Sequence, residues 1–433
     1  MIWEVERIEF QKSLRLGLGR AIIYAQGHDL REFRNLILDA CLHCYSYDVQ
    51  IEGTRASYMY DLVGCLPDKD FYYDAVLKSL PGSGDDVDAV QRFHLAACLA
   101  FDGSDESRQA MYESYVPGPD TGEQIGIDFL KLDGIKGLLF VAEKIGALLS
   151  GRPDEVDVGW LIDRSLEICG EPETWDALRE AGGTNPDVER YRRAAVAMVE
   201  RWTGEPAQRP DFTLLRYEQL SGELMARKRY LLPKWGERAS DEELEKAARG
   251  LIAATDPKQQ FAHLRIFAQR CFPCDVHTLL DLVGVEQDRV GWAAVKALAN
   301  VGDPAVRDLA FRLVEGRAKW RGEAIALLAR SYEEGDHKII LGWFQEEEDP
   351  EALHSMGMEL IDFWEAHPDD STQVSMLRSL YERGPCSFCR EGAVNRLLER
   401  GALPDELRAE CTWDANDDIR SLVNETGEAL PDR

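Results

Sequence analysis

A helix–turn–helix pattern that recurs about every 33 residues in the C-terminal half is the feature that most constrains this fold. Between residues 287 and 301, apolar residues occupy the i, i+3, i+4 and i+7 positions of one helical face. Gly302 ends that pattern, and Asp303 with Pro304 supplies an N-cap and a first-turn proline for a second helix. The sequence therefore predicts a helical hairpin over residues 287–314.

Further copies of this hairpin follow. Arg289 and Gly302 of the first copy recur as Arg321 and Gly335, one repeat length further along the chain. Arg390 falls close to two more periods after Arg321. Repeats of this length are typical of α-solenoids, in which each hairpin packs mainly on its neighbours. We expect an all-α protein built as a right-handed solenoid of stacked antiparallel helical hairpins.

One stretch of the repeat resembles a known family. The run AAVKALANVGDPAVRDLA, residues 293–310, resembles a HEAT repeat, with an inner helix followed by the Gly-Asp-Pro turn into the next outer helix. The resemblance covers about residues 256–423. It implies an architecture and leaves function open, because HEAT patterns are degenerate and a fold does not determine an activity.

The N-terminal half also has helical patterns, but with less regular spacing, and strand-like alternation is missing. The clearest helical patterns span residues 32–48, 55–67, 88–101 and 134–149. The Gly- and Pro-containing segment 203–211 is the expected boundary between the two halves. We predict an irregular helical region over residues 1–205 and a HEAT-like repeat array over residues 206–433.

The charge of the chain restricts its partners. Fifty Lys and Arg residues against 79 Asp and Glu residues give a formal net charge of −29. Such a field repels phosphate backbones and anionic lipid surfaces, so nucleic acid is disfavoured as a partner. A protein partner with a basic surface is the expected alternative. The charge also has a simpler interpretation, which is that it keeps the protein in solution.

No segment suits a membrane. A helix needs about 18 to 20 apolar residues to cross a bilayer, and the best stretch, residues 137–149, contains Glu143 and Lys144. The first ten residues, MIWEVERIEF, have acidic residues where a signal peptide carries positive charge. We therefore expect a cytoplasmic protein, in which cysteines are thiols or metal ligands.

Six of the ten cysteines form Cys-x-x-Cys pairs, a spacing that lets two sulfurs bind one tetrahedral metal ion. The pairs are Cys41/Cys44, Cys271/Cys274 and Cys386/Cys389. The first pair lies in an apolar helical run that favours core packing. Helical patterns flank the second pair and predict a turn between two helices.

The C-terminal pair is the candidate metal site. A helix after Cys389 and a returning helix that ends at Cys411 would bring this third sulfur beside Cys386 and Cys389. These three cysteines are candidate zinc ligands. Candidates for the fourth ligand are Asp414, Asp417, His354 and His367. We expect no bound cofactor, because free cysteines most often pack as small apolar residues, and a redox-active pair is a further alternative.

Residues 45–60 combine tyrosines, carboxylates and an arginine around a glycine, a denser polar and aromatic cluster than a repeat turn needs. Such a cluster suits a recognition loop, with Tyr47, Asp48, Glu52 and Arg55 as the candidate partner-binding residues. The structural alternative is that both carboxylates pair with the arginine while the tyrosines pack between helices.

Two basic clusters with aromatic neighbours occur despite the acidic total. The first contains Arg227, Arg229 and Trp235, and the second contains Arg317, Lys319 and Trp320. Aromatic rings interleaved with cations can bind single-stranded nucleic acid. Solvated helix ends whose aliphatic stems cover a neighbouring repeat have the same composition, and the net charge favours this second interpretation.

Catalytic motifs are missing from the sequence. It contains no P-loop, no glycine-rich dinucleotide turn, no His-Glu-x-x-His and no Gly-x-Ser-x-Gly. We expect a non-catalytic protein-binding scaffold or adaptor that uses the concave face of an acidic solenoid, including an inhibitor or immunity protein for a basic partner. The alternatives are a zinc-dependent module or enzyme at the C-terminal hairpin and a nucleic-acid-binding HEAT-like protein.

Overall fold

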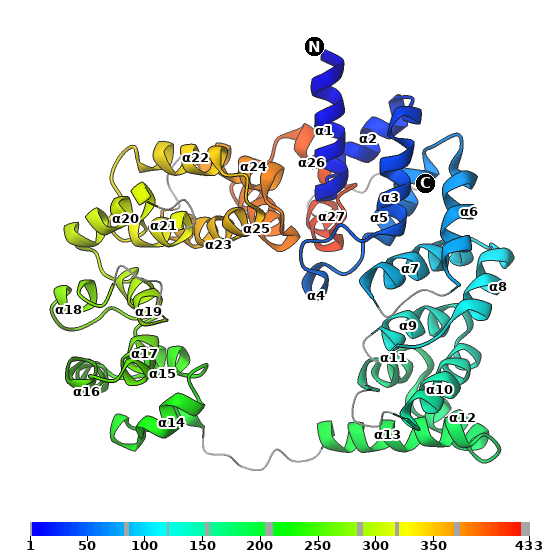
Figure 1. Ribbon diagram of the computed structural model, residues 1–433, viewed down its shortest axis with the longest axis horizontal. Helices are drawn as coiled ribbons and strands as arrows, with labels where there is room; N and C mark the ends of the chain where they lie inside the picture. Colours follow the sequence, from blue (N-terminus) through cyan, green and yellow to red (C-terminus); the bar gives the residue numbers. More distant parts are fainter. Residues whose placement is uncertain are drawn as a thin grey trace. The chain divides into compact units, whose positions relative to one another are not determined.

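The computed structural model describes most of the chain (Figure 1). The described residues are 2–81, 86–118, 121–151, 156, 158–203, 211–283, 289–316, 320–367 and 373–425. All regular elements within these ranges are helices, and no strand occurs among them, which confirms the all-α prediction. This part of the chain also contains no helix with the length and apolar character that a membrane crossing requires.

Contacts within the chain divide it into two units. Unit 1 comprises Met1–Glu205 and Leu403–Arg433, and unit 2 comprises Pro206–Ala402. The predicted division between residues 205 and 206 falls within 204–210, outside the described residues. The sequence analysis assigned residues 403–433 to the C-terminal array, and the contacts group them with unit 1.

Unit 1 is a set of short helices with two apolar cores. Its helices are α1 (Ile2–Leu16), α2 (Arg20–Gly27), the 3₁₀ helix η1 (Arg31–Phe33), α3 (Arg34–Leu42), α4 (Val49–Glu52), α5 (Ala56–Gly64), α6 (Lys69–Ser79), α7 (Val87–Phe101), α8 (Asp105–Ser114), α9 (Gly122–Asp133), α10 (Ile135–Leu149), α11 (Gly159–Cys169), α12 (Glu171–Gly182), α13 (Pro186–Thr203), α26 (Asp405–Cys411) and α27 (Asp417–Glu425). Each helix in part of this unit packs against the second helix after it in the sequence. Thus α5 contacts α7, α7 contacts α9 and α9 contacts α11. One core forms mainly between α1 and α6, and the other between α7 and α13.

The C-terminal segment of unit 1 packs on its N-terminal helices. The backbone N–H of Ala415 donates to the carbonyl oxygen of Gly17 over 2.8 Å, and Arg20 Nε donates to Glu410 Oε1 over 2.7 Å. Trp413 packs against the N-terminal apolar core. Unit 1 is therefore completed by a segment from the far end of the sequence.

Unit 2 contains most of residues 256–423, the region whose sequence pattern resembles a repeat. Its helices are the 3₁₀ helices η2 (Phe212–Leu214) and η3 (Tyr217–Gln219), then α14 (Gly222–Arg227), α15 (Leu232–Arg238), α16 (Asp241–Ala253), α17 (Pro257–Ile266), α18 (His277–Leu280), α19 (Arg289–Leu298), α20 (Pro304–Gly316), α21 (Arg321–Leu328), α22 (Asp336–Glu346), α23 (Pro350–Ala366), α24 (Gln373–Arg383) and α25 (Ser387–Glu399). Helices α17, α19, α21, α23 and α25 contact one another in series. Each hairpin thus buries part of its apolar face on the next.

Local capping chemistry explains where these helices begin. Asp303 Oδ1 accepts from the backbone N–H of Ala305 over 2.8 Å, and α20 begins at Pro304 as predicted. Asp349 repeats the arrangement, with its carboxylate accepting from Ala352 N–H over 3.0 Å at the start of α23. A side-chain oxygen at the N-cap satisfies an amide that has no partner inside the helix. Residues 287 and 288 of the first hairpin lie outside the described residues.

A buried ion pair joins two adjacent hairpins. Asp336, only 2% exposed, receives both terminal nitrogens of Arg307, with Nη2 lying 2.7 Å from Oδ1. Its carboxylate also accepts from the backbone N–H of Glu333 over 2.8 Å. The hydrogen bonds from Arg307 to this carboxylate raise the pKa of the arginine. Such a pair holds α20 against the start of α22, because either partner alone would leave a buried charge.

The C-terminal closure of unit 1 predicts a steric effect at Gly19. A Cβ atom there would overlap the carbonyl oxygen of Glu410 and the side chain of Trp413. We expect Gly19→Ala to lower the free energy of unfolding of unit 1 by about 1–3 kcal/mol, the usual cost of overpacking. Urea denaturation followed by circular dichroism measures this change.

Gly27→Ala is the control at the other end of α2, whose N-cap is Gly19, since a Cβ atom at Gly27 meets nothing within 4 Å. We expect no loss of stability from this substitution, because alanine favours a helix more than glycine does. Equal effects of the two substitutions would contradict the packing of residues 410–415 on α2.

Candidate functional site

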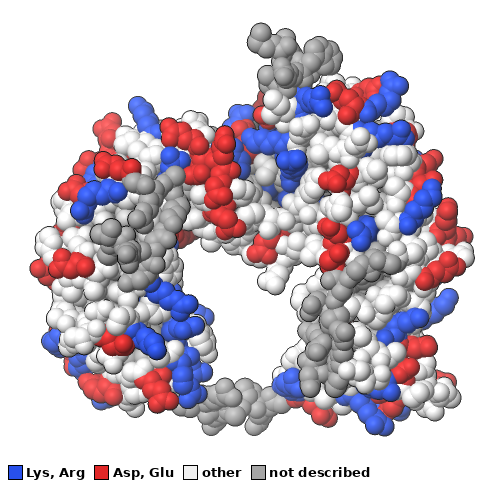
Figure 2. Space-filling model, in the orientation of Figure 1, with Lys and Arg blue, Asp and Glu red and all other residues white. Residues whose placement is uncertain are grey.

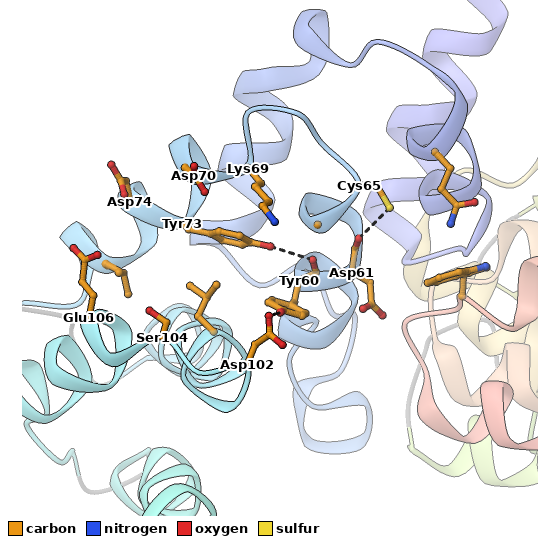
Figure 3. Close-up of a pocket in the computed structure, with 15 residues that line it drawn as sticks. Tyr60, Asp61, Cys65, Lys69, Asp70, Tyr73, Asp74, Asp102, Ser104 and Glu106 are labelled. Carbon is orange, nitrogen blue, oxygen red and sulfur yellow. Dashed lines mark hydrogen bonds between the residues drawn. The ribbon is translucent and has the colours of Figure 1, made fainter. Parts of the chain in front are cut away.

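A cavity of about 630 Å³ opens within unit 1 (Figure 3). Helices α5, α6 and α8, and the residues that follow α7, supply most of its lining. Its charged and aromatic lining residues are Tyr60, Asp61, Lys69, Asp70, Tyr73, Asp74, Asp102, Glu106 and Trp413. Cavities of this size are in the range that holds small molecules or several side chains of a partner.

Local features of the sequence position these side chains. Helix α8 begins after Ser104, whose hydroxyl accepts from Ser107 N–H over 3.1 Å and so places Glu106 in the first turn. On α6, Asp70 and Asp74 are spaced i, i+4 and share one helical face. Asp102 directly follows α7. Asp61 comes from α5, so the acidic lining is supplied by α5, α6, α8 and the residue that follows α7.

Two tyrosines lie among the carboxylates of the cavity. The hydroxyl of Tyr60 donates to Asp102 Oδ2 over 2.9 Å, and the hydroxyl of Tyr73 donates to the carbonyl oxygen of Tyr60 over 3.5 Å (Figure 3). Burial and the adjacent carboxylate raise the pKa of Tyr60 to about 12. Burial also raises the pKa of Tyr73. Both tyrosines therefore remain neutral hydrogen-bond donors at neutral pH.

The charge balance of this cavity is strongly negative. Five carboxylates face one ammonium group, that of Lys69. Among the described residues, neither Asp70 nor Glu106 has an ion-pair partner. Carboxylates beside aromatic rings bind ammonium and guanidinium groups through charge-assisted hydrogen bonds and cation–π contacts. The sequence analysis missed this site, although the Asp70–Asp74 spacing on a helix with Tyr73 was a usable signal.

A second cluster in unit 1 is a polar chain through a histidine. Thr54 Oγ1 lies 2.9 Å from His94 Nδ1, and His94 Nε2 lies 3.5 Å from Asp128 Oδ2. Asp128 is 8% exposed, and burial raises its pKa, while the positive charges of His94 and Lys131 oppose that shift. Burial also raises the pKa of Cys98, one turn after His94, to about 11. This thiol is therefore not a nucleophile at neutral pH.

A third cluster lies in unit 2 and combines a histidine with two cysteines. The ligand atoms of His354, Cys386 and Cys389 all lie within 4.8 Å of one another. Cys386 is the N-cap of α25, Cys389 is in its first turn, and His354 comes from α23. Cys389 Sγ lies 3.5 Å from His354 Nδ1. Both cysteines are buried and His354 is half-buried.

The surroundings of Cys386 favour its thiolate. The thiol of Cys389 donates to the sulfur of Cys386, as do the backbone N–H groups of Cys389 and Phe388 at the helix N-terminus. These hydrogen bonds, together with the nearby His354, lower the pKa of Cys386 to about 6 against the opposing effect of burial. A thiolate is the form of cysteine that binds metal ions and attacks electrophiles.

The predicted third sulfur belongs to the other unit. Cys411 is buried in unit 1, at the end of α26, whereas Cys386 and Cys389 are in unit 2. The three-sulfur site therefore stays a prediction, and the structure brings His354 to the C-terminal pair. Of the other pairs, Cys271/Cys274 occupies the loop between α17 and α18, and Cys41 is buried in α3.

The polar cluster of residues 45–60 is held together by internal contacts. Asp48 is the N-cap of α4 and accepts from Gln50 N–H over 3.0 Å. Glu52 and Arg55 form an ion pair of 3.4 Å, and their side chains are 4% and 5% exposed. Tyr47 is half-buried, and its backbone N–H donates to Glu52 over 3.4 Å. The Glu52–Arg55 pair matches the structural alternative for this segment, whereas Asp48 caps α4.

The first basic cluster has exposed cations and a buried ring. Figure 2 shows lysine and arginine side chains gathered over α14 and α15, and Arg227 and Arg229 are both exposed. Trp235 is 1% exposed, and its ring nitrogen donates to the carbonyl oxygen of Leu215 over 2.7 Å. This ring is therefore part of the core of unit 2, and its burial leaves little surface for stacking on a base.

In the second basic cluster, Trp320 is half-buried and is the N-cap of α21. The neighbouring Arg321 is paired with Glu346 and Glu347 over 3.2 Å each. Arg317 and Lys319 lie outside the described residues. The described cation of this cluster, Arg321, is therefore already paired with two carboxylates, one at the end of α22 and one directly after it.

Comparisons with known proteins do not assign this chain to a family. No family model matches it, and neither the curated proteins nor the solved structures include a match. The likeness to HEAT repeats thus rests on the sequence pattern and on helical packing compatible with a repeat. Any functional conclusion must come from the three sites described above.

The buried carboxyl of Asp128 predicts a pH-dependent stability difference. Its pKa in the folded state is raised, so its contribution to stability is present below its unfolded-state pKa and is lost as the pH rises through the folded-state value. Asp128→Asn removes this titration. We expect the free energy of unfolding of the variant, relative to the wild type, to increase as the pH rises above about 4.

Urea denaturation at a series of pH values measures this difference. Asp163→Asn, a change at an exposed carboxylate of α11, is the control and should show a flatter pH profile relative to the wild type. Parallel profiles for wild type and Asp128→Asn would contradict a raised pKa at this position.

Proposed function

We propose that this protein is a non-catalytic binding scaffold and that the acidic cavity of unit 1 receives a basic segment of a protein partner. The observation that supports this most directly is the ratio of five carboxylates to one lysine around a cavity of about 630 Å³. An inhibitor or immunity protein for a basic partner is one form of this function.

The chemistry of the lining favours lysine and arginine side chains over other ligands. A guanidinium or ammonium group entering the cavity can pair with Asp70 or Glu106, which have no ion-pair partner among the described residues. The neutral Tyr60 hydroxyl orients Asp102 without cancelling its charge. The rings of Tyr73 and Trp413 provide surfaces for cation–π contact.

The charge of the whole chain would assist this encounter. A net charge of −29 attracts a basic protein at long range and speeds association, while it discourages anionic competitors. Helices α5, α7, α9 and α11 of unit 1 pack in series, and such an array presents a long surface beyond the cavity itself. We propose the HEAT-like solenoid as the architecture that provides this surface.

A labelled peptide of alternating lysine, arginine and glycine residues is a suitable probe. We expect the full chain to bind it with an affinity that falls as salt increases, because salt screens exposed charges. The double substitution Asp70→Asn with Asp74→Asn should weaken binding by about three- to tenfold, since both carboxylates are exposed and an exposed ion pair contributes about 0.2–1 kcal/mol. Fluorescence anisotropy measures the dissociation constant.

The matched control places the same charge change outside the cavity. Glu143→Gln with Asp163→Asn removes two exposed carboxylates from α10 and α11 of unit 1. Because the net charge of both double variants is equal, only a specific role of the cavity predicts a difference between them. Equal weakening by the two variants would show that binding depends on the long-range field alone and would refute the proposed site.

A further inference from the structure

The cluster of His354, Cys386 and Cys389 in unit 2 is independent of the acidic cavity. Helices α23 and α25, which supply its three side chains, pack against each other. Helix α23 comes close to the sulfur of Cys389 at Gly357, one turn after His354. A Cβ atom at Gly357 would lie 3.4 Å from Cys389 Sγ. The nearest neighbour of such a Cβ atom is Leu380 Cδ1, at 2.9 Å, so the glycine lets α23 lie close to both Leu380 and Cys389.

The spacing of the three ligand atoms suits a tetrahedral ion. Zinc–sulfur and zinc–nitrogen bonds of about 2.3 and 2.0 Å place a sulfur and a nitrogen about 3.5 Å apart, and two sulfurs about 3.8 Å apart. Cys389 Sγ and His354 Nδ1 are 3.5 Å apart, and all three atoms lie within 4.8 Å of one another. One ion could therefore contact all three with small side-chain movements.

The donor set determines which metal is favoured. Two thiolates and an imidazole suit Zn²⁺, whereas Mg²⁺ and Ca²⁺ require oxygen ligands. Two thiolate charges also neutralise the charge of the ion, which matters because Cys386 and Cys389 are 1% and 0% exposed. The half-buried His354 leaves a side from which water can supply the fourth ligand.

We propose that Cys386, Cys389 and His354 bind one zinc ion, which joins α23 to the start of α25. The ion cross-links positions 354 and 386, which lie on either side of α24 in the sequence. It would therefore hold α23 and α25 together. The proposed site differs from the one considered in the sequence because an imidazole replaces the third sulfur.

Metal content of the purified, reduced full chain is the first measurement. We expect about one equivalent of zinc per chain, and less than about one tenth of an equivalent in Cys389→Ser. Cys274→Ser, which makes the same chemical change in a different Cys-x-x-Cys pair, should retain the full content. Zinc below one tenth of an equivalent in the wild type, with no binding when Zn²⁺ is added back, would overturn the proposal.

Two further variants identify the third ligand. We expect His354→Ala to weaken zinc binding by at least about a hundredfold in a competition titration with a chelating dye, whereas Cys411→Ser should leave it unchanged. The reverse result would replace His354 with the third sulfur and overturn the assignment. Circular dichroism of each variant confirms that it is folded before its affinity is interpreted.

Cobalt substitution gives a readout that does not depend on variants. Co²⁺ added to metal-free wild type should produce the visible bands of a tetrahedral site and a thiolate-to-cobalt charge-transfer band. A thiol count in denaturant distinguishes the redox alternative, because a reduced chain has ten thiols. A chain that resists reduction, lacks two thiols and shows no cobalt bands contains a disulfide at this pair and would refute the zinc site.

Discussion

Packing between alternate helices is the interaction on which the rest of this structure depends. A single helical hairpin cannot bury its apolar face alone, so α17, α19, α21, α23 and α25 each need the next helix in the series. The ion pair between Arg307 and Asp336 adds a polar contact between neighbouring hairpins. Because contacts run mainly between neighbours, the cluster of His354, Cys386 and Cys389 is assembled from α23 and α25, which pack against each other.

The features that could be predicted from sequence are those governed by local chemistry. The starts of α20 and α23 follow from Asp-Pro pairs, since an N-cap carboxylate and a first-turn proline act within a few residues. The packing of Trp413 and Ala415 on the first helices of unit 1 left no such signal. Contact between the two ends of the sequence depends on the complete arrangement of helices, which a periodic pattern does not contain.

The residues of the candidate sites show the same contrast between local motifs and long-range packing. Cys386 and Cys389 were found because their spacing is a local motif, whereas His354 is separated from them by α24 and joins them only through the packing of α23 on α25. Burial also determines how the first basic cluster is interpreted. The ring of Trp235 lies in the core of unit 2 and donates a hydrogen bond to Leu215, although its neighbours in sequence are cationic. Amphipathic periodicity predicts which face is buried, but it does not predict which aromatic side chain at a helix end turns inward.

The acidic residues of this protein fall into two classes with different consequences. Asp303, Asp336 and Asp349 accept hydrogen bonds from backbone amides or from an arginine, so their charges are already used in holding helices. Asp70 and Glu106 line a cavity and have no ion-pair partner in the described part of the chain. Clustered like charges without partners raise the free energy of the folded state, and a cationic ligand removes that repulsion as it binds. The net charge of −29 is therefore informative about function only where the carboxylates have no structural role.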